Sequence, residues 1–350
     1  MRRKQIGLYI HIPFCKQKCS YCDFCSYANK ESFIKRYIQC VLKEIIEVGN
    51  NNKIDFENGK DDLFLVKTIY IGGGTPSLID SKYIVQIIED IKLNFEIDEK
   101  AEITIEVNPG TVTLEKLEDY KRAGINRLSI GLQSTHEHLL KEIGRIHTYL
   151  DFLDTFRFAR EAGFENINVD LMIGIPNQTL EEVKDSIEEI VSMEPEHISV
   201  YSLILEENTP LFKKVEEGLE LPNEDLERKM YWAVKQTLEQ NNYIHYEISN
   251  FAKKGYESKH NLDCWNQKEY IGFGIAAHSY TNGIRYSNIE NIEQYIKNYD
   301  EDKTEENLVF HEKQDMEAMQ KEYMLLGLRK IDGVSIQEFK IKFVANPVFL

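Results

Sequence analysis

The sequence of 350 residues lacks any long apolar run. No stretch of about 18 consecutive apolar residues occurs, which argues against a membrane-spanning helix. The opening segment MRRKQIGLYIHIPF has polar breaks and no small-residue cleavage site, and its apolar part alternates like a strand. We therefore expect folded structure there rather than a signal peptide, and a cytoplasmic location.

The chain is also short of positive charge. It has 42 Lys and Arg residues against 59 Asp and Glu residues, a formal net charge of −17. Arg122, Arg127 and Arg145 are scattered rather than arranged as a stripe. Because binding to nucleic acid depends on clustered cations that displace counterions from phosphates, we expect no nucleic-acid partner.

Cysteine is scarce, but its placement is informative. Four of the six cysteines lie within eleven residues, at positions Cys15, Cys19, Cys22 and Cys25. A second CxxC or CxxH pair, which a zinc knuckle normally uses, is missing from the sequence. In a protein without an export signal, clustered thiols indicate a metal centre rather than disulfides.

The first 200 residues alternate short β-branched runs with amphipathic stretches. The predicted strands are 6–12, 64–71, 102–107, 126–131, 167–173 and 196–203. The predicted helices between them are 31–48, 80–95, 113–123, 148–162 and 178–192. This alternation is typical of parallel βαβ units with right-handed crossovers. Six units are too few for a closed eight-stranded barrel, so we predict an α/β fold, a partial (β/α)6 barrel with its chemistry at the carboxyl ends of the strands.

The rhythm of the sequence changes after about residue 205. We predict a barrel over 1–205, a smaller α/β extension over 206–305 and an incomplete, truncated helical tail domain over 306–350. Further helices are expected at 223–240 and 311–330, and the closing NPVFL resembles an interrupted element. Within the barrel, the polar run 49–62 predicts a flexible surface insertion.

The first predicted strand leads directly into the cysteine loop. Cys15, Cys19 and Cys22 form a C-x3-C-x2-C pattern. Three thiolates on so short a loop can bind three irons of one [4Fe–4S] cube and leave the fourth without a protein ligand. An amino acid's amino and carboxylate groups can chelate that iron, and an electron passed into a bound sulfonium could break a C–S bond. The alternatives are a zinc site, or a closed cluster with Cys25 as fourth ligand.

Polar residues follow or interrupt the later strands. The run GGGTPS (72–77) allows close backbone approach to a ligand. Glu106, Gln133 and Asp170 lie in otherwise apolar strands, where a polar side chain costs free energy unless it is paired or meets a ligand. Three such residues predict a shared polar cavity. His11, on the first strand, could equally pack inside the barrel or contact a ligand.

Together, the motifs LYIHIPFCKQKCSYCDF, IGGGTPS, ITIEVNPG, INRLSIGLQS, IGRIHT and INVDLMIGIPNQT resemble the coproporphyrinogen III oxidase-like radical S-adenosylmethionine (SAM) family. The similarity is greatest to its heme-chaperone branch, called HemW, and runs from about residue 5 to about 340. It implies that Cys15, Cys19 and Cys22 bind the cluster and that SAM caps the open iron. It also implies SAM contacts at Tyr9, Tyr21, Gly73, Gly74, Thr75, Glu106, Gln133, Arg145 and Asp170.

Two differences from the family's motifs help to decide between its oxidase branch and its heme-chaperone branch. The oxidases of the family carry an N-terminal extension and a further cysteine two residues after the third, whereas here fourteen residues precede Cys15 and that position is Phe24. The heme-chaperone branch carries a His-Asn…Trp segment, matched here by HNLDCW, in which His260 is a candidate heme ligand and Cys264 replaces the usual aromatic residue. A structural role for His260 is the alternative.

The resemblance thus implies a heme chaperone with a [4Fe–4S] cluster, SAM and heme as cofactors. Its implied partners are a heme-acceptor protein and an electron donor, with peripheral membrane association through an acceptor as a further option. Two other functions remain open at this point. They are an oxygen-independent coproporphyrinogen III oxidase and a closed-cluster electron-transfer protein.

Overall fold

The computed structural model describes residues 3–59 and 62–343. Within them, one twelve-stranded sheet has the order β14-β13-β12-β11-β1-β4-β5-β6-β7-β8-β10-β9. Its parallel strands are β11 (Tyr270–Phe273), β1 (Arg3–Ile12), β4 (Leu63–Gly73), β5 (Glu96–Val107), β6 (Arg127–Gln133), β7 (Ile167–Ile173) and β8 (His197–Ser202). The predicted six-strand parallel barrel is therefore confirmed, with β11 added beside β1.

Antiparallel strands extend both edges of the parallel part. They are β10 (Asn250–Ala252) and β9 (Ile244–Glu247) beside β8, and β12 (His278–Thr281), β13 (Ile284–Asn288) and β14 (Leu308–Lys313) beside β11. The chain after residue 205 thus supplies strands to the same sheet. The boundaries at 205 and 305 remain predictions.

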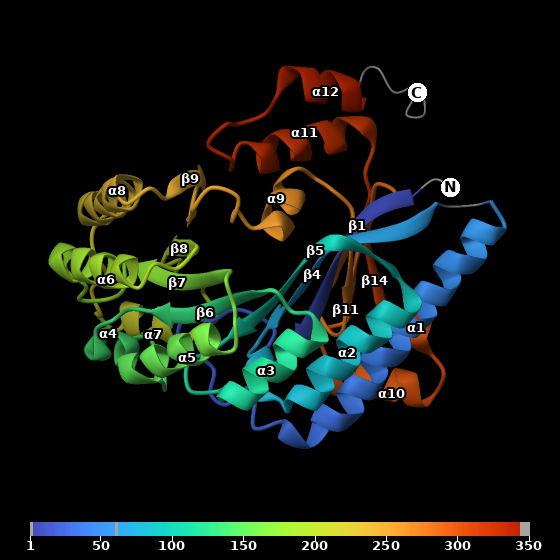
Figure 1. Cartoon of the computed structure of the whole chain (residues 1–350), viewed down its shortest axis with the longest axis horizontal. Helices are drawn as coiled ribbons and strands as arrows, with labels where there is room; N and C mark the ends of the chain where they lie inside the picture. The colour runs from blue at the N-terminus through green and yellow to red at the C-terminus, as the bar shows by residue number, and fades with distance from the viewer. Residues whose placement is uncertain (1–2, 60–61, 344–350) are drawn as a thin grey trace.

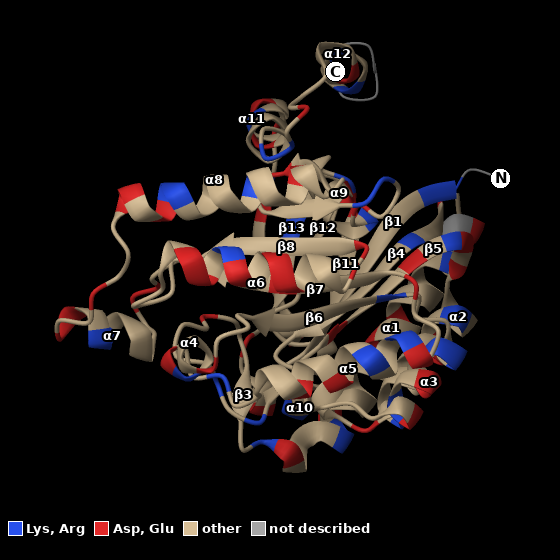
Figure 2. Cartoon of the chain, turned by 60° about the vertical axis from the view of Figure 1, so that its left-hand side comes forward, with Lys and Arg blue, Asp and Glu red and all other residues tan. Residues whose placement is uncertain are grey.

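Helices pack along the sheet and cover its apolar face (Figure 1). The barrel helices are α1 (Ile34–Glu57), α2 (Ser81–Asn94), α3 (Leu114–Ala123), α4 (Glu137–Glu142), α5 (Tyr149–Glu161) and α6 (Leu180–Ser192). The later helices are α7 (Pro210–Glu216), α8 (Glu224–Gln240), α9 (Lys259–Trp265), α10 (Ile292–Asp300), α11 (Met316–Gly327) and α12 (Ile336–Phe343). Acidic and basic residues are interspersed along the outer helices (Figure 2), and no described helix is long and apolar enough to cross a membrane.

Two predicted elements were wrong in part. The run 49–62 is no loop over most of its length, because α1 continues to Glu57, and buried Asn52 links the helix to the start of β4 by accepting from the backbone N–H of Phe64 at 3.0 Å. The predicted helix at 311–330 begins only at Met316, where the Asp315 side chain caps it, because Leu308–Lys313 pairs with β13. The NPVFL segment lies outside the described residues.

Candidate functional site

The cysteine loop begins where β1 ends. A small two-stranded sheet closes its base, formed by β2 (Phe14–Cys15) and β3 (Tyr27–Ala28). The far side of the loop is tied to the end of α4, because the backbone N–H of Ser20 donates to the carbonyl of Ile143 at 3.0 Å. Within this frame Cys15 is buried, while Cys19 and Cys22 are half-buried, and all three are free thiols. The loop therefore presents three unbridged sulfur atoms at the carboxyl end of the barrel.

Gly74 lets the end of β4 lie directly against this loop. Its backbone N–H donates to the carbonyl of Ile12 at 2.9 Å. A Cβ atom at Gly74 would lie 2.9 Å from the carbonyl carbon of Pro13 and 3.0 Å from the sulfur of Cys15. Both distances are too short for a side chain, so only glycine allows this contact. The predicted glycine run thus lies beside the first cysteine.

A series of hydrogen bonds connects the first two cysteines. The Arg145 guanidinium contacts the Cys19 sulfur at 3.8 Å and donates to Asn108 Oδ1 at 3.3 Å. Asn108 Nδ2 donates to Thr75 Oγ1 at 3.0 Å, and Thr75 Oγ1 donates to the Cys15 sulfur at 3.5 Å. The buried Arg145 Nε has no partner among the described residues. A buried cation with an unused donor beside sulfur fits a negatively charged, thiolate-bound group.

The thiols lie in surroundings that favour their neutral form in the free protein. Burial raises the pKa of Cys15 and of Cys22. No set of three or more His, Cys, Asp or Glu side chains in the described ranges is arranged to hold a single metal ion. A [4Fe–4S] cube does not require the side chains to converge on one ion, because each thiolate binds a different iron atom. The Cys25 thiol donates instead to the carbonyl of Glu290, at 3.6 Å.

Glu106 is held inside the barrel by β4. It accepts from the Tyr70 hydroxyl at 2.9 Å and from the backbone N–H of Gly73 at 3.1 Å. Burial raises the pKa of Glu106 to about 7, and the charge of Asp170 adds to the rise. A carboxyl group with this pKa can bind a cationic ligand as a carboxylate or hold a proton near neutral pH.

Tyr9 and His11 form a pair on β1. The Tyr9 hydroxyl contacts His11 Nδ1 at 3.0 Å, and His11 Nε2 lies 2.8 Å from the carbonyl of Cys25. Because burial lowers the pKa of His11 to about 4, the ring is neutral. Nε2–H then donates to Cys25 and Nδ1 accepts from Tyr9. His11 therefore links the barrel interior to the loop backbone.

The remaining predicted SAM contacts lie nearby but in different settings. Burial raises the pKa of Tyr21 to about 12, while the charge of Arg145 opposes the rise. Gln133 ends β6 with a φ of 77°, a left-handed conformation that is unusual for a side-chain-bearing residue. Asp170 accepts from Asn168 Nδ2 at 2.8 Å and Ser129 Oγ at 3.1 Å. It is thus already bonded within the barrel, and its role toward SAM stays a prediction.

His260 lies on α9, against the middle of β4 and away from the cysteine loop. Its Nδ1 is 2.8 Å from Thr68 Oγ1, and its backbone N–H donates to Glu102 Oε1 at 3.1 Å. Tyr70 stacks on the ring with centroids 5.2 Å apart, and Tyr9 stacks on Tyr70 at 6.3 Å. Three stacked rings therefore run from Tyr9 on β1 across Tyr70 on β4 to His260. Burial lowers the pKa of His260 to about 4, so its imidazole is neutral.

Several of these residues escaped the prediction from sequence. Thr68 and Tyr70 share the face of β4 that looks into the barrel, and a period of two from the glycine run would have marked them. Asn108, one residue beyond β5, has no comparable signal. Its place between Arg145 and Thr75 depends on contacts between separate strands.

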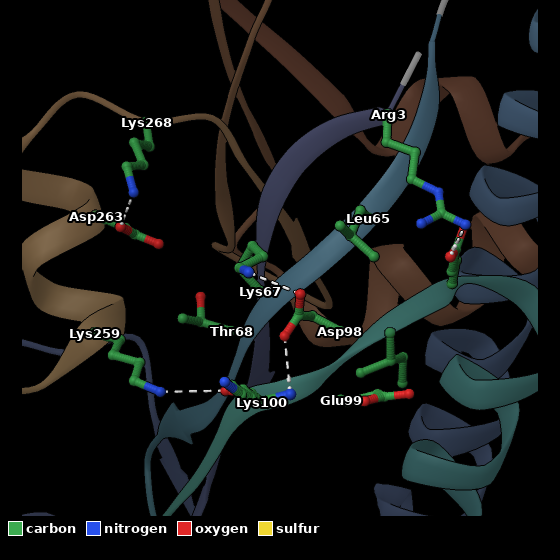
Figure 3. Close-up of a pocket in the computed structure, with 12 residues that line it drawn as sticks. Arg3, Leu65, Lys67, Thr68, Asp98, Glu99, Lys100, Lys259, Asp263 and Lys268 are labelled. Atoms are coloured by element: carbon green, nitrogen blue, oxygen red, sulfur yellow. Dashed lines mark hydrogen bonds and ion pairs between the residues drawn. The ribbon is translucent and has the colours of Figure 1, made fainter. Parts of the chain in front are cut away.

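A pocket of about 870 Å³ opens between α9 and the amino ends of β4 and β5 (Figure 3). It lies away from the cysteine loop and reaches Thr68, the partner of His260. Its charged groups largely pair with each other. Lys67 meets Asp98 at 2.8 Å, and Lys268 meets Asp263 at 2.6 Å.

Comparison with known proteins agrees with this arrangement. A model of the radical SAM superfamily matches residues 9–190. The heme chaperone HemW of Lactococcus lactis is 37% identical over 98% of this chain and 86% of its own length. HemW of Bacillus subtilis is 41% identical over 96% of this chain and 86% of its own.

A solved structure supports the fold separately. The coproporphyrinogen III oxidase HemN of Escherichia coli, a radical SAM enzyme, superposes with a TM-score of 0.82 over 97% of this chain and 79% of its own, at 21% identity. At that identity the likeness shows the fold alone. From the superfamily match and the relatives together, the chain belongs to the radical SAM superfamily and, within it, to the HemW family.

Proposed function

We propose that this protein is a heme chaperone, which binds heme at His260 and passes it to an acceptor protein. The observation that carries the proposal is the state of His260. With the proton on Nδ1, the ring donates to Thr68 and leaves the Nε2 lone pair free, and the hydrogen bonds of the described residues include none to Nε2. A neutral imidazole oriented by a bond at its other nitrogen is a suitable axial ligand for heme iron.

The cysteine loop would hold the second cofactor. Cys15, Cys19 and Cys22 are the proposed ligands of a [4Fe–4S] cluster. With SAM on its open iron, such a cluster supplies an electron of low potential for cleaving a C–S bond. Arg145 offsets the negative charge of the thiolates, and Glu106 offers a carboxylate to the cationic part of SAM. Tyr9, Tyr21, Gly73, Gly74, Thr75, Gln133 and Asp170 are the other proposed SAM contacts.

The relatives support the heme assignment. The proteins from Lactococcus lactis and Bacillus subtilis bear the name heme chaperone, and this chain spans 86% of each. The likeness to HemN concerns the fold and does not assign oxidase activity. We propose in addition a cytoplasmic location, an electron donor for the cluster, and an acceptor protein that takes the heme.

Heme titration of the anaerobically reconstituted protein, with and without SAM, tests the proposal. We expect about one heme per chain, lost in His260→Ala because the iron loses its axial ligand. His138→Ala is the matched control, since that histidine is exposed on α4. A wild-type protein that binds no heme would overturn the proposal.

A further inference from the structure

Arg127, the first residue of β6, is a buried cation that makes no direct ion pair among the described residues, although its charge is felt by the buried carboxyl of Asp170. Only 2% of its surface is exposed. Its Nε is sealed from solvent without a partner. Across residues 3–59 and 62–343, we find neither a hydrogen bond nor an ion pair that joins its side chain to another residue. A guanidinium in this state is unfavourable unless an anion from elsewhere reaches it.

The strand register places Arg127 on the same side of the sheet as His260. Tyr70 of β4 pairs with Thr104 of β5, and Thr104 pairs with Arg127 of β6. Side chains at paired positions of neighbouring strands point to the same face. Tyr70 uses that face to stack on His260. Arg127 lies near enough to His260 for its charge to lower the histidine's pKa further.

Thr104, the register partner of Arg127 on β5, also has a buried polar atom without a hydrogen-bond partner among the described residues. This atom is its hydroxyl oxygen, and the residue is fully buried. Two neighbouring residues thus face the barrel interior with unused donors, one charged and one neutral. Buried polar groups in folded proteins are normally paired, so two side by side indicate a ligand that both would contact.

The carboxylates nearby are already bonded elsewhere. Asp170 accepts from Asn168 and Ser129, and it interacts with Arg127 through its charge without a direct hydrogen bond or ion pair. Glu102 accepts from the backbone N–H groups of Lys259 and His260, at 3.2 and 3.1 Å. Arg127 therefore differs from Lys67 and Lys268 of the pocket in Figure 3, which form ion pairs with Asp98 and Asp263.

We propose that Arg127 and Thr104 form a carboxylate-binding subsite beside His260. This inference rests on the proposed function, because a ligand held at His260 through its iron would bring the carboxylates of the heme propionates into the same part of the barrel. Arg127 would pair with one propionate and Thr104 would donate to it. The subsite would set the orientation of the heme relative to α9.

A comparison of hemin with hemin dimethyl ester, whose propionates carry no charge, tests the subsite. We expect wild-type protein to bind hemin about 10- to 100-fold more tightly than the ester, as a hydrogen-bonded charge pair predicts. Arg127→Met should bring the two affinities together and leave ester binding unchanged. Arg157→Met is the control, because Arg157 is exposed on α5 and pairs with Asp154. Thr104→Val should narrow the preference by a smaller factor.

The melting temperature gives a second readout. If Arg127 is kept for a ligand, Arg127→Met should melt close to wild type in the absence of heme, because no direct hydrogen bond or ion pair of its side chain is lost. A lower melting temperature together with an unchanged preference would overturn the proposal and make Arg127 a structural cation. The wild-type comparison needs no variant. Equal binding of hemin and ester overturns the subsite alone, whereas binding of neither overturns the heme assignment too.

Discussion

At the scale of single residues, Gly74 is the position where the cysteine loop tolerates least change. A Cβ atom there would lie 2.9 to 3.0 Å from the backbone of Pro13 and Phe14 and from the Cys15 sulfur. Backbone atoms cannot rotate away as a flexible side chain can. We therefore expect Gly74→Ala to displace the loop and to lose most of the iron and sulfide incorporated on anaerobic reconstitution.

Gly163→Ala is the control for that prediction. Gly163 has open space around it and a φ of 82°, so an alanine costs about 1 kcal/mol of stability through its backbone alone. This variant should melt earlier yet retain the full iron content. A Gly74→Ala protein with normal iron and sulfide would show that the loop can move away from β4 without losing the cluster.

Glu106 should make stability depend on pH in a recognisable way. Its pKa lies at about 7 in the folded protein against an ordinary value of 4.5, so between these values the folded state keeps a proton that the unfolded state releases. The free energy of unfolding then falls as pH rises through that interval. Glu106→Gln has no proton to release, so its stability relative to wild type should increase by about 3 kcal/mol from pH 4.5 to pH 7. Urea denaturation of both proteins without cofactors measures it, and a constant difference would contradict the assignment.

The cysteine loop could be singled out at this scale as a candidate ligand set because its spacing is local in sequence. Glu106, Gln133 and Asp170 could also be singled out, as polar residues within apolar strands. The hydrogen-bond partners of these three residues could not be predicted from the sequence. Tyr70 on β4 donates a hydrogen bond to Glu106 on β5, and Ser129 on β6 donates one to Asp170 on β7.

At the scale of elements, one carboxylate on α1 holds the later strands in place. Glu44 accepts from the backbone N–H of Gly274 at 2.8 Å, from Asn288 Nδ2 at 2.6 Å and from the Tyr295 hydroxyl at 2.7 Å. Glu44→Ala would leave three buried donors unpaired and should cost about 3 kcal/mol or more. Hydrogen exchange should locate the loss in β11 to β13. Glu47→Ala, exposed on the same helix, should change stability by less than about 0.5 kcal/mol.

The alternating part of the chain was predictable as elements because helix and strand periods differ. The strands predicted at 64–71 and 167–173 lie within β4 and β7 as observed. The addition of β11 beside β1 was not predictable, since strands 4 residues long carry little pattern and their pairing spans the whole chain. The polar composition of 49–62 was misleading for another reason, because the exposed side of a helix is also polar.

At the scale of the whole molecule, the two proposed cofactor sites lie at different levels along the same strands. His260 contacts Thr68 in the middle of β4, and the cysteine loop contacts Gly74 just beyond its end. The five residue steps of extended strand from Thr68 to Gly73 span about 17 Å. The stacked rings of Tyr9, Tyr70 and His260 run across β1 and β4 rather than along them, because Tyr9 and Tyr70 are paired in register.

Each site should therefore load without the other, because the cysteine loop and His260 are separated along β4 by more than the ~10 Å within which residues usually couple. A triple variant, with Cys15, Cys19 and Cys22 changed to alanine, should keep heme affinity within about twofold of wild type. His260→Ala should keep its iron and sulfide while losing heme. Absorbance titration with heme and chemical iron analysis of both proteins measure the pair of outcomes. If the triple variant loses heme as completely as His260→Ala does, the heme instead lies against the cysteine loop, and the proposed separation of the two cofactor sites along β4 is wrong.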